Sequence, residues 1–175
     1  GTPFAIQIAV TAAVGAALAA PERMIISVTG DGSLMPNMHD LSVMSYNKLN
    51  LKLFIINNEG YVSIRNTQHS FFEGHQVGTD ADSGIFIPKI GDLAKAFQLP
   101  HLVCHNEAEL NKIIKKAASM KGPVICEIIA TQNQQILPSV TSIRLENGKM
   151  MSQPIHNMSP VIPIEELQKI MGIGT

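Results

Sequence analysis

Two clusters of polar residues and glycines carry groups that could bind a metal ion and a diphosphate. Asp31 lies in the run Gly-Asp-Gly-Ser that begins at Gly30, and 24 residues (33–56) separate its Gly-Asp-Gly from the run Asn-Asn-Glu-Gly that begins at Asn57. Carboxylate, amide and carbonyl oxygens are ligands that Mg²⁺ accepts. Glycines beside a helix start let backbone N–H groups approach phosphate oxygens. Together the two clusters predict a site for a Mg²⁺–diphosphate.

Each cluster follows an apolar run that is typical of a buried β-strand. Residues 24–29 (MIISVT) lead into Gly30, and residues 51–56 (LKLFII) lead into Asn57. The carboxyl ends of parallel strands lie at one edge of a sheet, where ligands bind in open α/β folds. Asp31 alone would be an ordinary turn or N-cap residue, because short glycine motifs recur by chance. The second cluster is what favours a metal site.

Strand-like and helix-like segments alternate through most of the chain. We expect strands at 24–29, 51–57, 100–105 and 123–130, and helices at 5–20, 38–48, 60–72, 90–97 and 107–120. This alternation predicts an α/β fold, a doubly wound parallel sheet flanked by helices. Gly15 inside the first helix suggests close packing at that point.

The chain is expected to form one domain over 1–131, followed by a tail over 132–175. The tail is polar and contains prolines, and we expect a short helix at 164–170 that packs on a neighbouring domain or subunit. The 73–88 segment is rich in Gly and Asp without periodicity, which predicts a mobile loop, either a plain surface loop or a lid. Because the chain begins at Gly1 rather than Met, we expect a fragment or a processed product.

Composition argues against several classes of protein. The net charge is −1 with no basic block, which argues against nucleic acid as a partner. No apolar run approaches the roughly 18 residues of a membrane span. Cys104 and Cys126 lie in apolar runs without metal-site spacing, so we expect reduced core cysteines in a cytoplasmic protein. Only 15% of residues are charged, so we expect much of the surface to be either uncharged or covered by another part of the protein or a partner.

Several runs around the two clusters carry a family resemblance. RMIISVTGDGSL, LKLFIINNEGYVSIRNTQ and FFEGHQVGTDADSG are among them, as are ENGKMMSQPIHNMSP and PIEELQKIM. The first two contain GDG followed about two dozen residues later by NN, which resembles the thiamine-diphosphate (ThDP) motif. The runs together are similar to the large subunit of acetolactate synthase, over nearly the whole chain. The resemblance implies the carboxyl-terminal cofactor (PP-type) domain of a longer enzyme.

The resemblance also implies which residues bind the cofactor. Mg²⁺ would be held by Asp31, Asn58 and the backbone carbonyl of Gly60, while Asn57 would fix the turn. The other implied contacts to the diphosphate surround the same clusters: Gly30, Gly32, Ser33, Tyr61 and Val62. Family members usually carry a Gly-x-Met-Gly-like loop before the alanine-rich helix, whereas this chain reads GTPFAIQIAVT. The resemblance therefore implies contacts to the diphosphate half of the cofactor only.

A reaction and partners follow from the same resemblance. The implied chemistry is decarboxylation of a small 2-oxoacid and ligation to a second carbonyl compound. The activating glutamate would lie on a separate pyrimidine-binding domain, so no catalytic residue is expected in this chain and the chain alone should be inactive. The native protein would be a homodimer or tetramer. Alternatives are a 2-oxoacid decarboxylase, a ThDP lyase of sugar or cell-surface metabolism, or, in another class, a non-catalytic diphosphate-nucleotide binding module.

Overall fold

The chain forms two units that are described separately. The computed structural model describes residues 8–132, 137–140, 142–145 and 147–172. The chain divides into residues 1–133 and residues 134–175. Within the described residues, no helix has the length and apolar character needed to cross a membrane.

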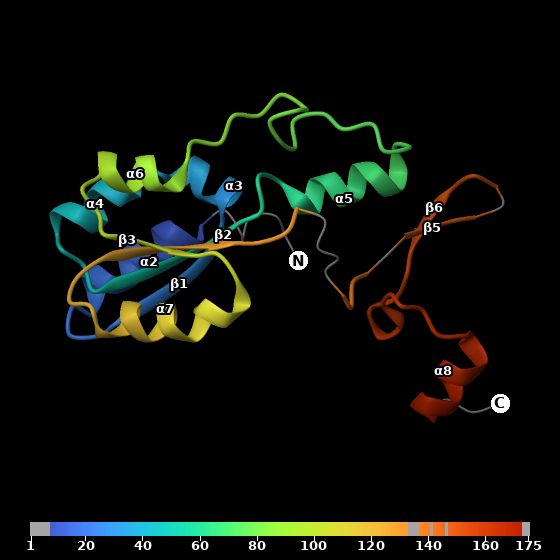
Figure 1. Cartoon of the computed structure of the whole chain (residues 1–175). Coiled ribbons are helices and arrows are strands. Elements are labelled where there is room, and N and C mark those ends of the chain that lie inside the picture. The colour runs from blue at the N-terminus through green and yellow to red at the C-terminus, as the bar shows by residue number, and fades with distance from the viewer. Residues whose placement is uncertain (1–7, 133–136, 141, 146, 173–175) are drawn as a thin grey trace. The chain divides into compact units, whose positions relative to one another are not determined.

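The first unit is built on a four-stranded parallel sheet (Figure 1). Its strands are β1 (Ile25–Gly30), β2 (Leu51–Asn57), β3 (His101–Cys104) and β4 (Val124–Ile129). Their spatial order is β1-β2-β4-β3, and every pair is parallel. The strand β4 therefore enters the sheet between β2 and β3, so the chain does not simply add each strand at one edge.

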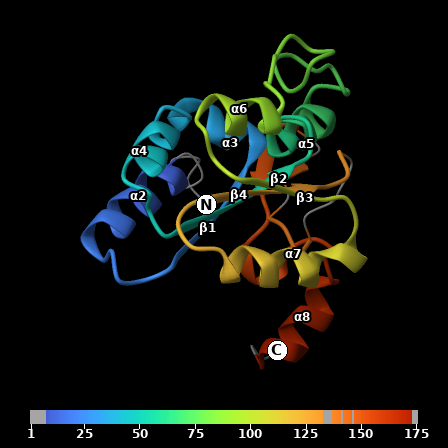
Figure 2. The same cartoon turned by 60° about the vertical axis from the view of Figure 1, so that its left-hand side comes forward.

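Helices cover both faces of this sheet (Figure 2). The helices α2 (Ala9–Ala19), α4 (Asp40–Tyr46) and α6 (Ile90–Ala96) share one apolar core with alternate residues of β2, among them Leu53 and Ile55. The helix α7 (Glu107–Ser119) packs on the other face, where Phe54 and Cys126 point. Because helices lie on both faces, the central strands β2 and β4 are mostly apolar, with Lys52 and Glu127 as their buried charged residues. The predicted doubly wound α/β fold is confirmed.

The first helices differ in part from the sequence-based expectation. The helix predicted at 38–48 is present as α4, but the chain already turns helical at the glycine cluster, in α3 (Asp31–Leu34) and η1 (Met35–Asn37), which was not predicted. Pro36 fits this region because its missing N–H is tolerated in a first helical turn. Residues 5–7 of the first predicted helix lie outside the described residues. Gly15 is exposed with no atom within 4 Å of a Cβ built there, so the close packing predicted at Gly15 is wrong.

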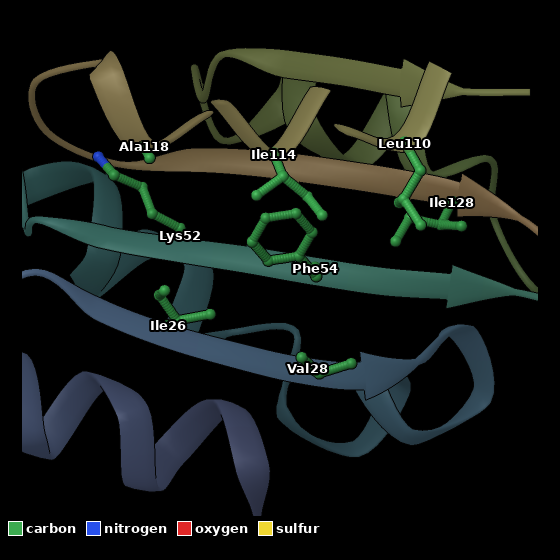
Figure 3. A pocket seen from close by; sticks show the side chains of 8 residues that line it. All are labelled: Ile26, Val28, Lys52, Phe54, Leu110, Ile114, Ala118 and Ile128. Carbon is green, nitrogen blue, oxygen red and sulfur yellow. The ribbon is translucent and has the colours of Figure 1, made fainter. Parts of the chain in front are cut away.

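The face that carries α7 has an apolar groove, whose lining side chains are drawn in Figure 3. A groove of about 330 Å³ lies between β1, β2 and α7, lined by Ile26, Val28, Lys52, Phe54, Leu110, Ile114, Ala118 and Ile128. Ile26 and Val28 are 58% and 60% exposed. Lys52 is buried, and its Nζ donates to the carbonyls of Met120 and Gly122, both at 2.6 Å. Burial lowers the pKa of Lys52.

The second unit contains more regular structure than the predicted polar tail. The strands β5 (Ser142–Arg144) and β6 (Met150–Ser152) pair antiparallel, and η2 (Ile155–Asn157) and α8 (Ile164–Met171) follow. The buried side chain of Asn157 exchanges two hydrogen bonds with the backbone of Ile162, at 3.1 and 3.0 Å. The short helix expected at 164–170 is present, whereas the hairpin was not predicted.

Candidate metal and diphosphate site

Asp31 and the turn after β2 meet at the carboxyl edge of the sheet. The register pairs Gly30 with Ile56, so the residues that follow the two strands lie side by side. Asp31 is the first residue of α3 and only 1% exposed. Its Oδ2 accepts a hydrogen bond from the N–H of Gly60 at 2.9 Å, and its Oδ1 accepts one from Gly32 at 2.8 Å.

The carboxylate of Asp31 is a buried charge. Desolvation raises its pKa above the usual value, and hydrogen bonds from Gly32 and Gly60 offset only part of this effect. Among the ion pairs of the described residues, none joins Asp31 to a Lys, Arg or His. A buried anion without a counter-ion is unfavourable, so a cation bound beside it would stabilise the site.

Asn58 brings a third group to the same point. Its terminal amide lies 3.2 Å from Asp31 Oδ1 and 3.1 Å from the carbonyl oxygen of Gly60. With the amide nitrogen inward, Asn58 donates hydrogen bonds to both oxygens. With the amide oxygen inward, three oxygens converge, one each from Asp31, Asn58 and Gly60. The amide can adopt either orientation because its two ends are nearly the same in shape.

This donor set fits magnesium. Mg²⁺ prefers oxygen ligands and usually keeps several waters beside one or two carboxylates and the phosphates of its ligand. One carboxylate, one amide and one backbone carbonyl leave room for those additional ligands. Within the described part of the chain, no group of three or more His, Cys, Asp or Glu residues could hold a metal ion. The arrangement thus does not fit a zinc-type site.

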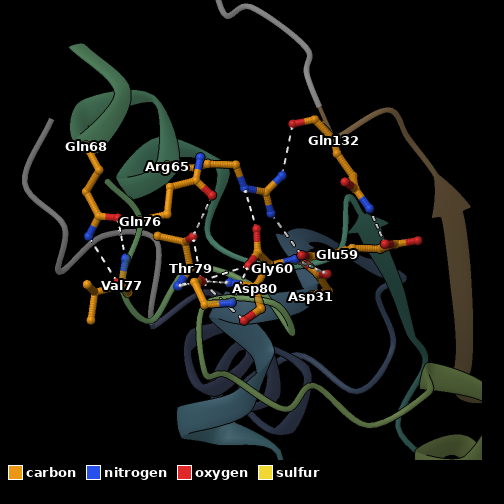
Figure 4. Close-up of polar contacts among 11 residues, drawn as sticks. Asp31, Glu59, Gly60, Arg65, Gln68, Gln76, Val77, Thr79, Asp80 and Gln132 are labelled. Atoms are coloured by element: carbon orange, nitrogen blue, oxygen red, sulfur yellow. Dashed lines mark hydrogen bonds and ion pairs between the residues drawn. The ribbon is translucent and has the colours of Figure 1, made fainter. Parts of the chain in front are cut away.

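The 57–61 turn requires glycine at position 60 (Figure 4). Glu59 and Gly60 both have positive φ angles, of 58° and 130°. A Cβ at Gly60 would lie 2.1 Å from the carbonyl oxygen of Thr79. The next residue, Tyr61, donates its N–H to that same oxygen at 2.8 Å. Only glycine therefore allows the backbone to approach Thr79 while its N–H contacts Asp31 and its carbonyl lies beside the Asn58 amide.

The other predicted diphosphate contacts surround this point in different ways. Gly30 ends β1, and Ser33 lies half-buried in α3. A Cβ at Gly32 would lie 2.7 Å from the ring of Tyr61, so this glycine makes room for the ring. The N–H of Gly32 is bonded to Asp31 and is not free for a phosphate in this structure. Val62 begins α5 (Val62–Phe71), whose first turn has no side-chain cap and can offer N–H groups to an anion.

Comparison with known proteins decides the family. Residues 5–128 match the family model described as thiamine pyrophosphate enzyme, C-terminal TPP binding domain, thiamine pyrophosphate being another name for ThDP. The chain belongs to this family. It is 31% identical over 149 residues to the acetolactate synthase large subunit of Porphyra purpurea, covering 85% of this chain and 24% of that protein. It is also 30% identical over 129 residues to the acetolactate synthase isozyme 1 large subunit of Escherichia coli (strain K12), covering 74% and 22%.

A solved structure supports the same fold. The thiamine diphosphate-dependent 4-hydroxybenzoylformate decarboxylase of Rhodococcus jostii RHA1 superposes with a TM-score of 0.63 and 25% identity, covering 74% of this chain and 24% of that one. The chain thus spans about a quarter of the length of the relatives it matches. It corresponds to a cofactor-binding domain of larger enzymes.

The TPP-binding domain holds Asn57 through residues that the sequence analysis did not single out. Asn57 Nδ2 donates to Glu127 Oε1 at 2.6 Å, and His101 Nε2 lies 2.8 Å from Glu127 Oε2. Asn57 Oδ1 accepts the N–H of Glu59 at 3.2 Å, so Asn57 fixes the turn, as expected. Glu127 faces Asn57 only because β4 lies next to β2. That neighbourhood depends on strand order, which the sequence pattern does not reveal.

The 73–88 segment is less free than the sequence suggests. Gln68 of α5 donates to the carbonyl of Val77 at 3.0 Å and accepts its N–H at 2.9 Å. Thr79 is fully buried against the 57–61 turn. The stretch around Val77 and Thr79 is therefore tied to α5 and to the turn, and the mobility expected of the 73–88 segment stays a prediction.

Proposed function

We propose that this domain binds ThDP through a Mg²⁺ ion held by Asp31, Asn58 and the carbonyl of Gly60. The observation that carries the proposal is the convergence of these three groups on one point, with amide contacts of 3.1 and 3.2 Å. The unpaired, buried charge of Asp31 supports it, because a cation would neutralise that charge. Membership of the TPP-binding family supplies the cofactor class.

When bound, ThDP supplies the electron sink for cleavage of a 2-oxoacid. The residues of this chain would orient the diphosphate and neutralise its charge. Asp31 and Asn58 would fix the metal, and the uncapped start of α5 would face the phosphates. The absence of a side chain at Gly32 lets the ring of Tyr61, which precedes α5, pack closely on α3. The domain would thus position the cofactor, and groups on another domain would carry out proton transfer.

For the whole protein we propose an acetolactate-synthase-like reaction, in which a 2-oxoacid is decarboxylated and joined to a second carbonyl compound. The named relatives support this reaction class. A simple 2-oxoacid decarboxylase is the second candidate, favoured by the fold neighbour that decarboxylates 4-hydroxybenzoylformate. In either case the activating glutamate would come from a pyrimidine-binding domain, and the present chain alone would be inactive.

Calorimetric titration of the intact protein with ThDP, with MgCl₂ or with EDTA, tests the proposal. We expect binding that requires Mg²⁺, abolished by Asp31→Ala and weakened by Asn58→Ala. Asp82→Ala is the matched control, because Asp82 is an exposed aspartate outside the site. A parallel titration with ADP separates the nucleotide-binding alternative, which would retain ADP and ignore ThDP. Unchanged ThDP affinity in Asp31→Ala would refute the metal assignment.

A further inference from the structure

The 57–61 turn has a backbone shape that its own sequence does not favour. Glu59 is not glycine, yet its φ is 58°, a left-handed conformation that is unfavourable for residues with a Cβ. The Gly60 carbonyl lies beside the Asn58 amide, and the Gly60 N–H contacts Asp31, only while this shape persists. The hydrogen bond from Glu59 to Asn57 holds part of it, and contacts from outside the turn can hold the rest.

Arg65 makes the contact that reaches the turn from α5 (Figure 4). Its Nη2 donates to the carbonyl of Glu59 at 3.0 Å, and its Nη1 donates to the carbonyl of Gln132 at 3.1 Å. The side chain of Gln132 also bonds to the side chain of Glu59. One buried guanidinium thus joins the turn after β2 to the chain that leaves β4.

The third side of the guanidinium faces Asp80. Arg65 Nε lies 3.2 Å from Asp80 Oδ2, and this contact is an ion pair rather than a hydrogen bond, because Nε makes no hydrogen bond within the described residues. Asp80 is in turn fixed by Ser83, whose Oγ and N–H donate to Oδ1 at 2.7 and 3.0 Å. The Ser83 hydroxyl and the nearby Arg65 charge help to hold the pKa of Asp80 below its ordinary value. A carboxylate that stays ionised is the counter-ion that a buried arginine needs.

We propose that Arg65, oriented by Asp80, is a positioning residue that sets the affinity of the domain for Mg²⁺ without touching the ion. The inference rests on the proposed function, because it concerns the same metal. Arg65 holds the Glu59 carbonyl, one residue before the proposed carbonyl ligand of Gly60. Lysine at position 65 would keep the positive charge, but its single ammonium group cannot reproduce the two hydrogen bonds and the ion pair that the planar guanidinium makes in different directions.

The test measures ThDP binding by the intact protein at saturating ThDP while MgCl₂ is varied. We expect Arg65→Lys and Asp80→Asn each to raise the MgCl₂ concentration at half-saturation about 10–100-fold, the usual effect of losing a group that orients a metal ligand. Binding should recover fully at high MgCl₂, because Asp31 and Asn58 remain. The matched controls are Arg23→Lys and Asp82→Asn, which make the same chemical changes at exposed residues and should leave the midpoint unchanged.

The double variant and a stability measurement separate positioning from a purely structural role. Arg65→Lys and Asp80→Asn combined should shift the midpoint little more than the larger single change, because the residues act through one contact. A purely structural role would lower the melting temperature of the metal-free protein and leave the midpoint of the folded fraction unchanged. If Arg65→Lys does not fold, Asp80→Asn alone carries the test.

Two negative results have different meanings. Wild-type protein that binds ThDP with Mg²⁺, together with variants whose midpoint does not move, would overturn this inference alone. Wild-type protein that binds no ThDP in MgCl₂ would overturn the proposed function and this inference with it.

Discussion

At the scale of single residues, folding and metal binding favour opposite protonation states of Asp31. Folding removes its carboxylate from water, which favours the protonated form and raises its pKa. Binding of Mg²⁺ requires the ionised form. The residue is therefore costly to the metal-free fold at neutral pH, and a bound cation would relieve that cost.

This conflict predicts opposite pH trends for stability and binding. Because the pKa of Asp31 is raised on folding, its stabilising contribution is present below the pKa of the unfolded chain and is lost as pH rises through the folded pKa. The Mg²⁺-dependent affinity for ThDP should instead rise over that window. Urea unfolding of metal-free protein and calorimetry over one pH series, each compared with Asp31→Asn, measure the two trends. Identical pH profiles in wild type and variant would contradict the prediction.

A second prediction at this scale concerns two glycines with opposite requirements. Gly60→Ala should destabilise the protein by about 1–3 kcal/mol, since alanine would occupy a positive-φ position against the Thr79 carbonyl. Gly15→Ala, in an open helical position, should stabilise it by about 0.5–1 kcal/mol. Equilibrium unfolding in urea measures both changes. A Gly60→Ala variant as stable as Gly15→Ala would show that the 57–61 turn is not tightly constrained.

At the scale of elements, what could be predicted depends on whether the signal is local. The runs before Gly30 and Asn57 predict two parallel strands because apolar periodicity and glycine punctuation lie within each segment. That pattern was sufficient to predict that Asp31 and Asn58 lie close together. The link from Arg65 to Asp80 could not be predicted, because it depends on how the 73–88 segment folds back on α5. The hairpin of β5 and β6 was missed because each strand has only three residues.

The hydrogen bonds between Gln68 and Val77 predict how the 73–88 segment responds to protease. Gln68→Ala should increase cleavage near Val77, because it removes both hydrogen bonds that hold this residue. Thr67→Ala is the control, since the Thr67 hydroxyl donates to the carbonyl of Ser63 within α5 and not to the 73–88 segment as the structure describes it. Limited proteolysis followed by mass spectrometry locates the cuts. In the intact protein we also expect Mg²⁺–ThDP to slow cleavage, as for a lid, and equal cleavage with and without them would count against a lid.

At the scale of the whole molecule, the sheet of the first unit is unevenly protected. The strand β1 pairs with β2 on one side only, and its sequence IISVTG has no charge or proline of the kind that usually protects an edge strand. Ile26 and Val28 lie on this strand and line the groove beside α7. An apolar surface of this kind, with 15% charged residues in the chain, favours a domain that is covered in the native protein.

We therefore predict that the native protein is at least a dimer, with each ThDP held at its diphosphate end by Asp31 and Asn58 and at its pyrimidine end by a domain of the other chain. Multi-angle light scattering of the intact protein with Mg²⁺ and ThDP measures the assembly state. Mixing an Asp31→Ala subunit with a subunit that lacks the activating glutamate should restore part of the activity, because one of the two sites in the mixed dimer would be complete. A fully active monomer would show that the site is not shared.

The amide of Asn58 has one further consequence for how a cation reaches this domain. With its nitrogen inward, it donates to Asp31 Oδ1 and to the Gly60 carbonyl, the oxygens that would otherwise contact the metal. In the metal-free protein the Asn58 amide therefore competes with a cation, because its N–H groups donate to the same two oxygens. Loading the ion would need a half-turn about one side-chain bond and no movement of the backbone. The 57–61 turn can thus keep a single shape in both states, with the exchange confined to one amide group.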